Sequence, residues 1–173
     1  MQFMSRIVAA FALIFSLSSW QADADSGALP PPQGTPILTM TGAIAKTNAD
    51  AGAQFDAAMI AALPRHAITT GTPWYDEPRT FEGPLLRDVL AAVGASGKTL
   101  TVAALNDYAS DVPFSDALTY DVVIADRIDG QPIPIRDRGP LFIIYPFDQV
   151  PALKSEQYYQ RSVWQVKSIK VQP

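Results

Sequence analysis

An uninterrupted apolar run near the end of the chain places the strongest constraint on the fold. The run is Leu141–Tyr145 (LFIIY), and a strand that has no polar side must be covered on both faces. We therefore expect Leu141–Tyr145 to be an inner strand, with other parts of the chain packed against each side of it.

Several other segments have the β-branched or alternating pattern that is typical of strands. They are Ile37–Thr41, Ala67–Thr70, Thr99–Leu105, Tyr120–Asp126, Ile133–Ile135 and Val163–Val171. Asp129-Gly130 is a hairpin signal between two of them. Helical spacing predicts short helices over residues 55–63 and 85–93, with Gly94 as the left-handed residue after the second. Strands outnumber helices, which predicts an α+β fold with a mixed, mostly antiparallel sheet and short flanking helices.

The N-terminal residues have the three parts of a secretory signal. Arg6 precedes the apolar run Ile7–Leu17, and Ala22-Asp23-Ala24 matches a small-residue cleavage site. The run is shorter than the roughly 20 residues that a membrane-spanning helix needs. We predict a cleaved signal peptide over residues 1–24, a Pro-rich linker over 25–36 and one domain over 37–173. The protein is then periplasmic or secreted.

Composition excludes several kinds of chemistry. The 173 residues include no cysteine and one histidine, which excludes disulfides, thiolate nucleophiles, iron–sulfur clusters and multi-histidine metal sites. The formal net charge of -4 gives no electrostatic basis for binding nucleic acid. Dinucleotide, P-loop, nucleophile-elbow and zinc-protease motifs are absent from the sequence.

The ionisable residues that remain do not form a recognisable catalytic pattern. His66 alone would have to serve any acyl-transfer triad, and we expect it to be structural or solvent-facing. Four aspartates lie close together in the sequence: Asp107, Asp111, Asp116 and Asp121. Their spacing matches no calcium loop, so we interpret them as a solvated acidic surface.

An aromatic loop is the first candidate binding element. Residues 71–78 hold Trp74 and Tyr75 after the predicted strand Ala67–Thr70, and such loops often bind ligands. The alternative is that both rings only pack beneath the loop. A flat heteroaromatic ligand needs aromatic faces for stacking and fixed polar groups at its edge. Residues of both kinds near predicted strand ends are Trp74, Tyr75, Asn106, Tyr108, Arg138, Tyr158, Tyr159, Arg161, Ser162 and Trp164.

Five successive segments resemble blocks of the oxidoreductase molybdopterin-binding family, which has the sulfite-oxidase fold. The segments are TFEGPLLRDVLAAVG, ALNDYASDVPFSD, YDVVIADRIDGQPIP, GPLFIIYP and QRSVWQVKSIKV. The resemblance extends from about Leu38 to Val171 and implies the sulfite-oxidase-like molybdopterin-binding fold. In catalytic members, a cysteine in the loop before the helix block ligates molybdenum. Here that loop offers Thr70–Trp74 without a thiol, and threonine is no substitute for a soft thiolate.

The resemblance also implies a ligand and a role. A pterin is the expected ligand, without molybdenum, and molybdopterin is the alternative. Thr70, Thr72 and Asp107 join the candidate pterin-binding residues on this ground. The leading hypothesis is an exported pterin sensor, not an enzyme, that signals to the periplasmic domain of a membrane protein such as a cyclic-di-GMP-turnover enzyme. The alternatives are a molybdopterin-dependent oxidoreductase, or a subunit of one, and a structural module that binds no ligand.

Overall fold

The computed structural model describes residues 28–173, so the predicted signal peptide and the first residues of the predicted linker lie outside the described part. The strands are β1 (Leu38–Gly42), β2 (Ala53–Phe55), β3 (Arg65–Thr72), β4 (Tyr75–Pro84), β5 (Thr99–Ala104), β6 (Ala109–Pro113), β7 (Val123–Ala125), β8 (Arg127–Ile128), β9 (Gln131–Pro132), β10 (Phe142–Ile144) and β11 (Val166–Gln172). The α-helices are α1 (Ala57–Ala62), α2 (Leu86–Ala92), α3 (Phe114–Thr119) and α4 (Glu156–Arg161), and the 3-10 helices are η1 (Ile135–Asp137) and η2 (Pro151–Leu153). The predicted α+β class is confirmed.

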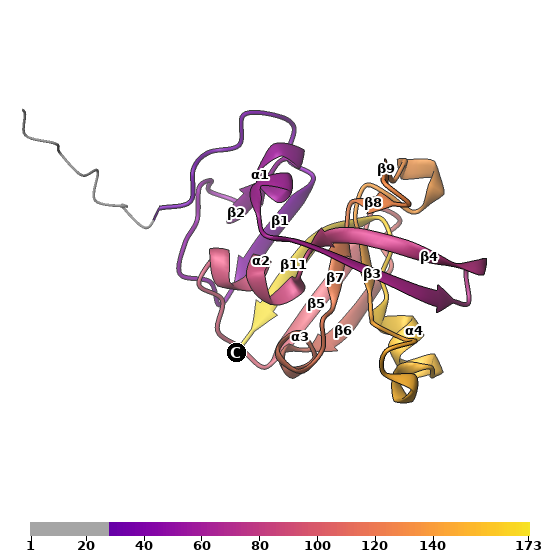
Figure 1. The fold of residues 1–173 in the computed structure, drawn as a ribbon. Helices are drawn as coiled ribbons and strands as arrows, with labels where there is room; N and C mark the ends of the chain where they lie inside the picture. Colours follow the sequence, from indigo (N-terminus) through magenta and orange to yellow (C-terminus); the bar gives the residue numbers. More distant parts are fainter. Residues whose placement is uncertain (1–27) are drawn as a thin grey trace, which may run out of the picture.

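A five-stranded sheet forms one side of the domain, in the order β2-β1-β11-β5-β6 (Figure 1). Only β1 and β11 pair in parallel, and the other neighbours are antiparallel. The ladder between β11 and β5 is irregular between Val166 and Ser168. This irregularity shifts the alternation, so Val166, Ile169 and Val171 all face the core although their spacing is uneven.

The long hairpin of β3 and β4 belongs to a second sheet, in the order β3-β4-β8-β9. The prediction of a loop over residues 71–78 is wrong, because β3 extends to Thr72 and β4 begins at Tyr75. Only Pro73 and Trp74 form the turn. Pro78 is tolerated in β4 because it falls in the irregular stretch between the Thr72–Tyr75 and Thr70–Arg79 pairs, where no ladder partner is required.

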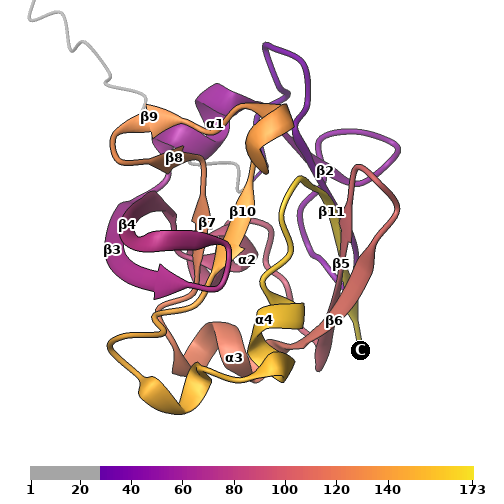
Figure 2. The same cartoon turned by 90° about the vertical axis from the view of Figure 1, so that its right-hand side faces the viewer.

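A third sheet consists of two strands, β7 and β10. It lies between the two larger sheets together with α2 (Figure 2). The prediction for Leu141–Tyr145 is confirmed, since each of these residues is 0% exposed. Gly83 of β4 packs so closely on β7 that a Cβ would lie 1.9 Å from the carbonyl oxygen of Ile124. The crossing of β4 over β7 therefore requires glycine.

The strand predicted over Ile133–Ile135 does not form. β9 ends at Pro132, and Ile135 begins η1 with 60% of its surface exposed. Pro132 and Pro134 lack the N–H groups that a continued ladder would need. The hairpin signal itself is confirmed, because Asp129 and Gly130 have φ angles of 49° and 77° and join β8 to β9.

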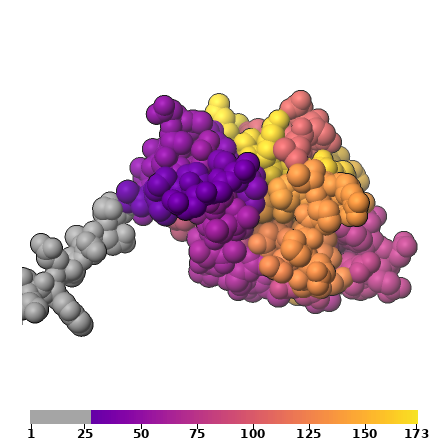
Figure 3. Space-filling view, turned by 90° about the horizontal axis from the view of Figure 1, so that it is seen from above, coloured from indigo at the N-terminus to yellow at the C-terminus, as the bar shows by residue number. Residues whose placement is uncertain are grey.

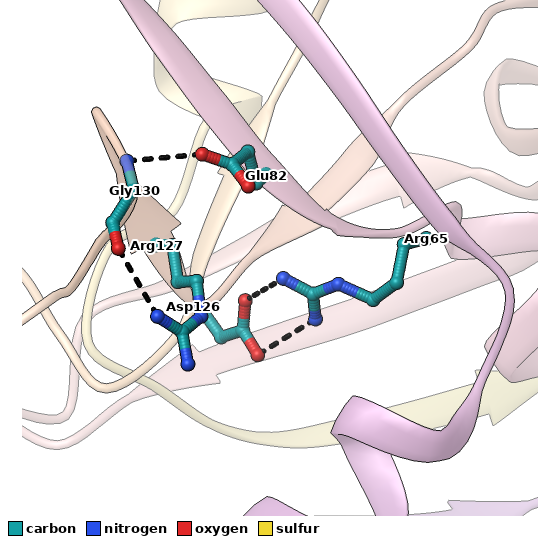
Figure 4. Close-up of polar contacts among 5 residues, drawn as sticks. All are labelled: Arg65, Glu82, Asp126, Arg127 and Gly130. Carbon is teal, nitrogen blue, oxygen red and sulfur yellow. Dashed lines mark hydrogen bonds and ion pairs between the residues drawn. The ribbon is translucent and has the colours of Figure 1, made fainter.

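Polar contacts join the β3–β4 hairpin to the residue before β8 and to the turn after it (Figure 4). The guanidinium of Arg65 donates to both carboxylate oxygens of Asp126, at 2.8 and 2.6 Å. Glu82 accepts a hydrogen bond of 3.0 Å from the backbone N–H of Gly130, whose carbonyl accepts one of 3.1 Å from Arg127. These bonds fix the β8–β9 turn against β4.

The described part of the predicted linker, residues 28–36, lies along the domain and does not extend away from it. The Asp56 carboxylate caps α1 through Met59 and also accepts from the backbone N–H groups of Gln33 and Gly34. These donors, Met59 first, hold the pKa of Asp56 below its usual value. Seen from above, the N-terminal part of the domain lies beside the surface around β8 and β9 (Figure 3). No helix in residues 28–173 has the length and apolar character to cross a membrane.

Candidate functional site

A cavity of about 370 Å³ lies where three parts of the chain meet. They are the turn between β3 and β4, the turn between β5 and β6, and α4 with the segment that follows it. We call this cavity the aromatic pocket. Its lining residues are Pro73, Trp74, Asn106, Tyr108, Glu156, Tyr159, Gln160, Ser162, Val163 and Trp164. The volume lies within the range of small-molecule sites, roughly 300–1,000 Å³.

Trp74 is the centre of the aromatic wall. Its ring lies 5.8 Å from that of Trp164 and 6.1 Å from that of Tyr159, both edge-to-face. Beneath it, the Phe142 ring of β10 lies at 5.3 Å. Trp74 is half-buried, so it both packs against the core and presents surface to the pocket. The two interpretations of the ring offered by the sequence are therefore compatible.

The tip of the β3–β4 hairpin is held in place by the segment after β10. Asp148 accepts a 2.7 Å hydrogen bond from the Gly71 N–H, and its own N–H donates to the Thr70 hydroxyl at 3.0 Å. Lys154 pairs with the Asp148 carboxylate at 2.6 Å; this contact, with the Gly71 N–H, lowers the pKa of Asp148. Thr70 is fully buried in this arrangement. Its hydroxyl therefore serves the fold and does not line the pocket.

The turn between β5 and β6 forms the opposite rim. Asn106 accepts from the Tyr108 N–H at 3.2 Å, and the Tyr108 hydroxyl donates to the Gln160 carbonyl of α4 at 3.1 Å. Asp107, with a left-handed φ of 66°, directs its carboxylate to Lys167 at 2.7 Å. That contact lowers the pKa of Asp107. Asp107 is absent from the pocket lining, while its neighbours on both sides contribute to it.

A buried polar cluster anchors α4 to α3 and to Tyr145, the residue after β10. The Asp116 Oδ2 atom accepts from Arg161 and from the Tyr145 hydroxyl, both at 2.9 Å. The Arg161 guanidinium also lies 5.0 Å from the Tyr158 ring centre. Burial, and then the Asp116 carboxylate, raise the pKa of Tyr145. We call Asp116, Tyr145 and Arg161 the anchor cluster.

The anchor cluster corrects one prediction. Asp116 is 6% exposed, so its assignment to a solvated acidic surface is wrong. Arg161 is absent from the pocket lining, and one nitrogen of its guanidinium donates to Asp116. This bond ties the end of α4, which forms one wall of the pocket, to the core, and the predicted contact between Arg161 and a ligand stays a prediction.

Tyr75 and Arg138 lie to one side of the aromatic pocket. The Arg138 guanidinium carbon is 5.0 Å from the Tyr75 ring centre and 5.8 Å from that of Trp164. Tyr75 lines a second hollow of about 320 Å³, next to β8 and β9. Arg138 thus lies between Tyr75, which lines the second hollow, and Trp164, which lines the aromatic pocket. Arg138 itself lines neither of them.

The structure brings six of the thirteen candidate residues together. Those in the aromatic pocket are Trp74, Asn106, Tyr108, Tyr159, Ser162 and Trp164, and those outside it are Thr70, Thr72, Tyr75, Asp107, Arg138, Tyr158 and Arg161. Sequence reasoning missed Pro73, Glu156, Gln160 and Val163. For two of these residues the sequence does hold a signal. Glu156 and Gln160 are four residues apart, a spacing that places two side chains on the same face of a helix. His66 lies opposite Gly83, at the other end of β3 from the turn.

Comparison with known proteins identifies the family. The model of the oxidoreductase molybdopterin binding domain matches residues 54–155, and the chain belongs to this family. The fold is similar to that of the sulfane dehydrogenase SoxCD from Paracoccus pantotrophus, with a TM-score of 0.59 and 18% sequence identity. The match covers 78% of this chain and 37% of that chain. Among curated proteins, no sequence matches this one. The predicted sulfite-oxidase-like fold is confirmed.

The residues present do not fit a thiolate-ligated molybdenum centre. The chain has no cysteine, and the Thr70 hydroxyl is engaged with Asp148. The Thr72 hydroxyl oxygen is buried and has no hydrogen-bond partner among the described residues. Residues 28–173 contain no group of three or more His, Asp or Glu side chains arranged to hold a metal ion. What the site offers is an aromatic pocket with a few polar groups, which suits a flat ring.

Proposed function

We propose that this chain is a pterin-binding protein that does not catalyse a redox reaction. The observation that carries the proposal is the aromatic pocket itself, in a chain of the molybdopterin-binding family that has no cysteine. Trp74, Tyr159 and Trp164 offer ring surfaces, and stacking on an aromatic side chain contributes about 1–3 kcal/mol per ring. Asn106 and Gln160 offer amide donors and acceptors for the edge of the ring.

Metal analysis combined with mass spectrometry of the extracted ligand tests this proposal. Protein purified from a host that makes molybdenum cofactor is expected to carry a pterin and far less than one molybdenum per chain. Stoichiometric molybdenum with molybdopterin would instead support an oxidoreductase, or a subunit of one. Protein that carries no ligand and binds no added pterin would support a structural module.

Export and signalling complete the proposal and rest on the sequence pattern and the family resemblance. The protein is secreted or periplasmic, and its pterin-bound form contacts the periplasmic domain of a membrane protein such as a cyclic-di-GMP-turnover enzyme. N-terminal sequencing of the protein from the cell envelope is expected to start at about Asp25. Full-length protein that remains in the cytoplasm would contradict export. Co-purification of a membrane protein that does not depend on pterin would contradict the sensing role.

A further inference from the structure

Glu156 is the one charged side chain in the lining of the aromatic pocket. Its Oε1 atom accepts a 3.1 Å hydrogen bond from Gln160 one helical turn later. Within residues 28–173 the carboxylate forms no ion pair. A carboxylate can accept about four hydrogen bonds, so most of its capacity remains open to a ligand.

The fold fixes the position of the helix that carries this carboxylate. Gln160, its partner, is bonded through its carbonyl to the Tyr108 hydroxyl across the pocket. The next residue, Arg161, is bound by the buried Asp116. Both contacts hold α4 against the rest of the domain, and this places Glu156 at the edge of the pocket.

We propose that Glu156 selects ligands that present two neighbouring N–H donors on one ring edge. This inference rests on the proposed function and deepens it. The two oxygens of a carboxylate match two parallel N–H groups, as they do in pairs with arginine. A 2-amino-4-oxopteridine has such an edge in its amino group and ring N–H. A 2,4-dioxopteridine has a carbonyl in place of the amino group, which sets an acceptor against the carboxylate and leaves the charge poorly paired.

Stacking and edge recognition then have separate roles. Trp74, Tyr159 and Trp164 contact the faces of either ring system equally well, so they contribute affinity without distinguishing the two. Glu156 supplies the difference. Because Glu156 is exposed, solvent competes for its hydrogen bonds, and we expect a preference of about ten-fold, below what a fully buried polar contact achieves.

The test is a calorimetric titration of pterin and of lumazine, its 2-oxo analogue, into wild type, Glu156→Gln and Glu77→Gln. Glu77→Gln is the matched control, because it removes the same charge from an exposed residue of β4 outside the pocket lining. Wild type and the control are expected to bind pterin about ten-fold more tightly than lumazine. In Glu156→Gln this preference is expected to fall to within about three-fold, with lumazine affinity retained.

Two outcomes would overturn the inference, and they are distinguishable. If Glu156→Gln keeps the wild-type preference for pterin, Glu156 does not read the ring edge, although the proposed function stands. If wild type binds neither compound, the proposed function fails and this inference fails with it. Thermal melts of the three proteins are expected to coincide. This result would verify that substitutions at the two exposed glutamates leave the fold intact.

Discussion

Replacing Asp116 with alanine is expected to lower the free energy of unfolding by about 3 kcal/mol. The substitution leaves the Arg161 guanidinium and the Tyr145 hydroxyl without their shared acceptor. Removing one partner of a buried ion pair costs about 3–5 kcal/mol. We expect the lower end of that range, since the side chains of Arg161 and Asp116 are 14% and 9% exposed.

Urea unfolding at neutral pH, followed by far-ultraviolet circular dichroism, measures this loss. Asp111→Ala is the matched control. Asp111 belongs to the same acidic segment, but within residues 28–173 its side chain accepts a single, exposed hydrogen bond, from Thr101. Its stability is expected to stay within about 1 kcal/mol of wild type. Equal effects of the two substitutions would mean that the anchor cluster does not stabilise the fold.

Replacing Trp74 with alanine is expected to weaken pterin binding by about ten- to a hundred-fold. The loss of one stacked ring accounts for roughly 1–3 kcal/mol of binding free energy. The same substitution is expected to lower stability by about 2 kcal/mol, because the ring also packs on Phe142, Tyr159 and Trp164. A fully buried tryptophan would cost more, about 3–5 kcal/mol. The sequence left open whether the Trp74 ring binds a ligand or packs beneath the loop, and these contacts give it a packing role.

Affinity per folded molecule separates the two effects of Trp74→Ala. Titrations are made well below the melting temperature of the variant, with Trp74→Phe as the variant that keeps an aromatic ring. Trp74→Phe is expected to retain most of the affinity. His66→Ala, altered at the far end of β3, is expected to bind within a few-fold of wild type. If Trp74→Ala loses stability but binds each folded molecule as wild type does, Trp74 is only a packing residue.

The sequence predicts the turns and helix ends whose conformation is set by adjacent residues. Gly94 has a left-handed φ of 61° after α2, and Asp129-Gly130 forms the expected turn. Pairing between distant segments was harder to predict. The sequence pattern predicts the strand Ala67–Thr70 within β3 but a loop over residues 71–78. The prolines and aromatic residues there resemble loop composition, while the ladder between β3 and β4 depends on partners several residues away. The helix α4 was missed because its sequence, EQYYQR, has no apolar stripe.

The sequence predicts site residues only where the type of a residue indicates that it lines a pocket. Aromatic residues that face a pocket were found by type and by the family resemblance. The burial of Asp116 and its pairing with Arg161 could not be predicted, because the two are 45 residues apart in the chain and nothing in the sequence shows that they pair. The charged side chain in the pocket lining is that of Glu156.

The most direct test of the central claim is a calorimetric titration of a reduced pterin into the purified wild-type domain, residues 25–173. We predict saturable binding at one site per chain, with the tryptophan fluorescence of the protein changing over the same concentration range. Absence of binding at millimolar pterin, in protein that melts cooperatively, would contradict the claim that the aromatic pocket of this cysteine-free domain holds a pterin.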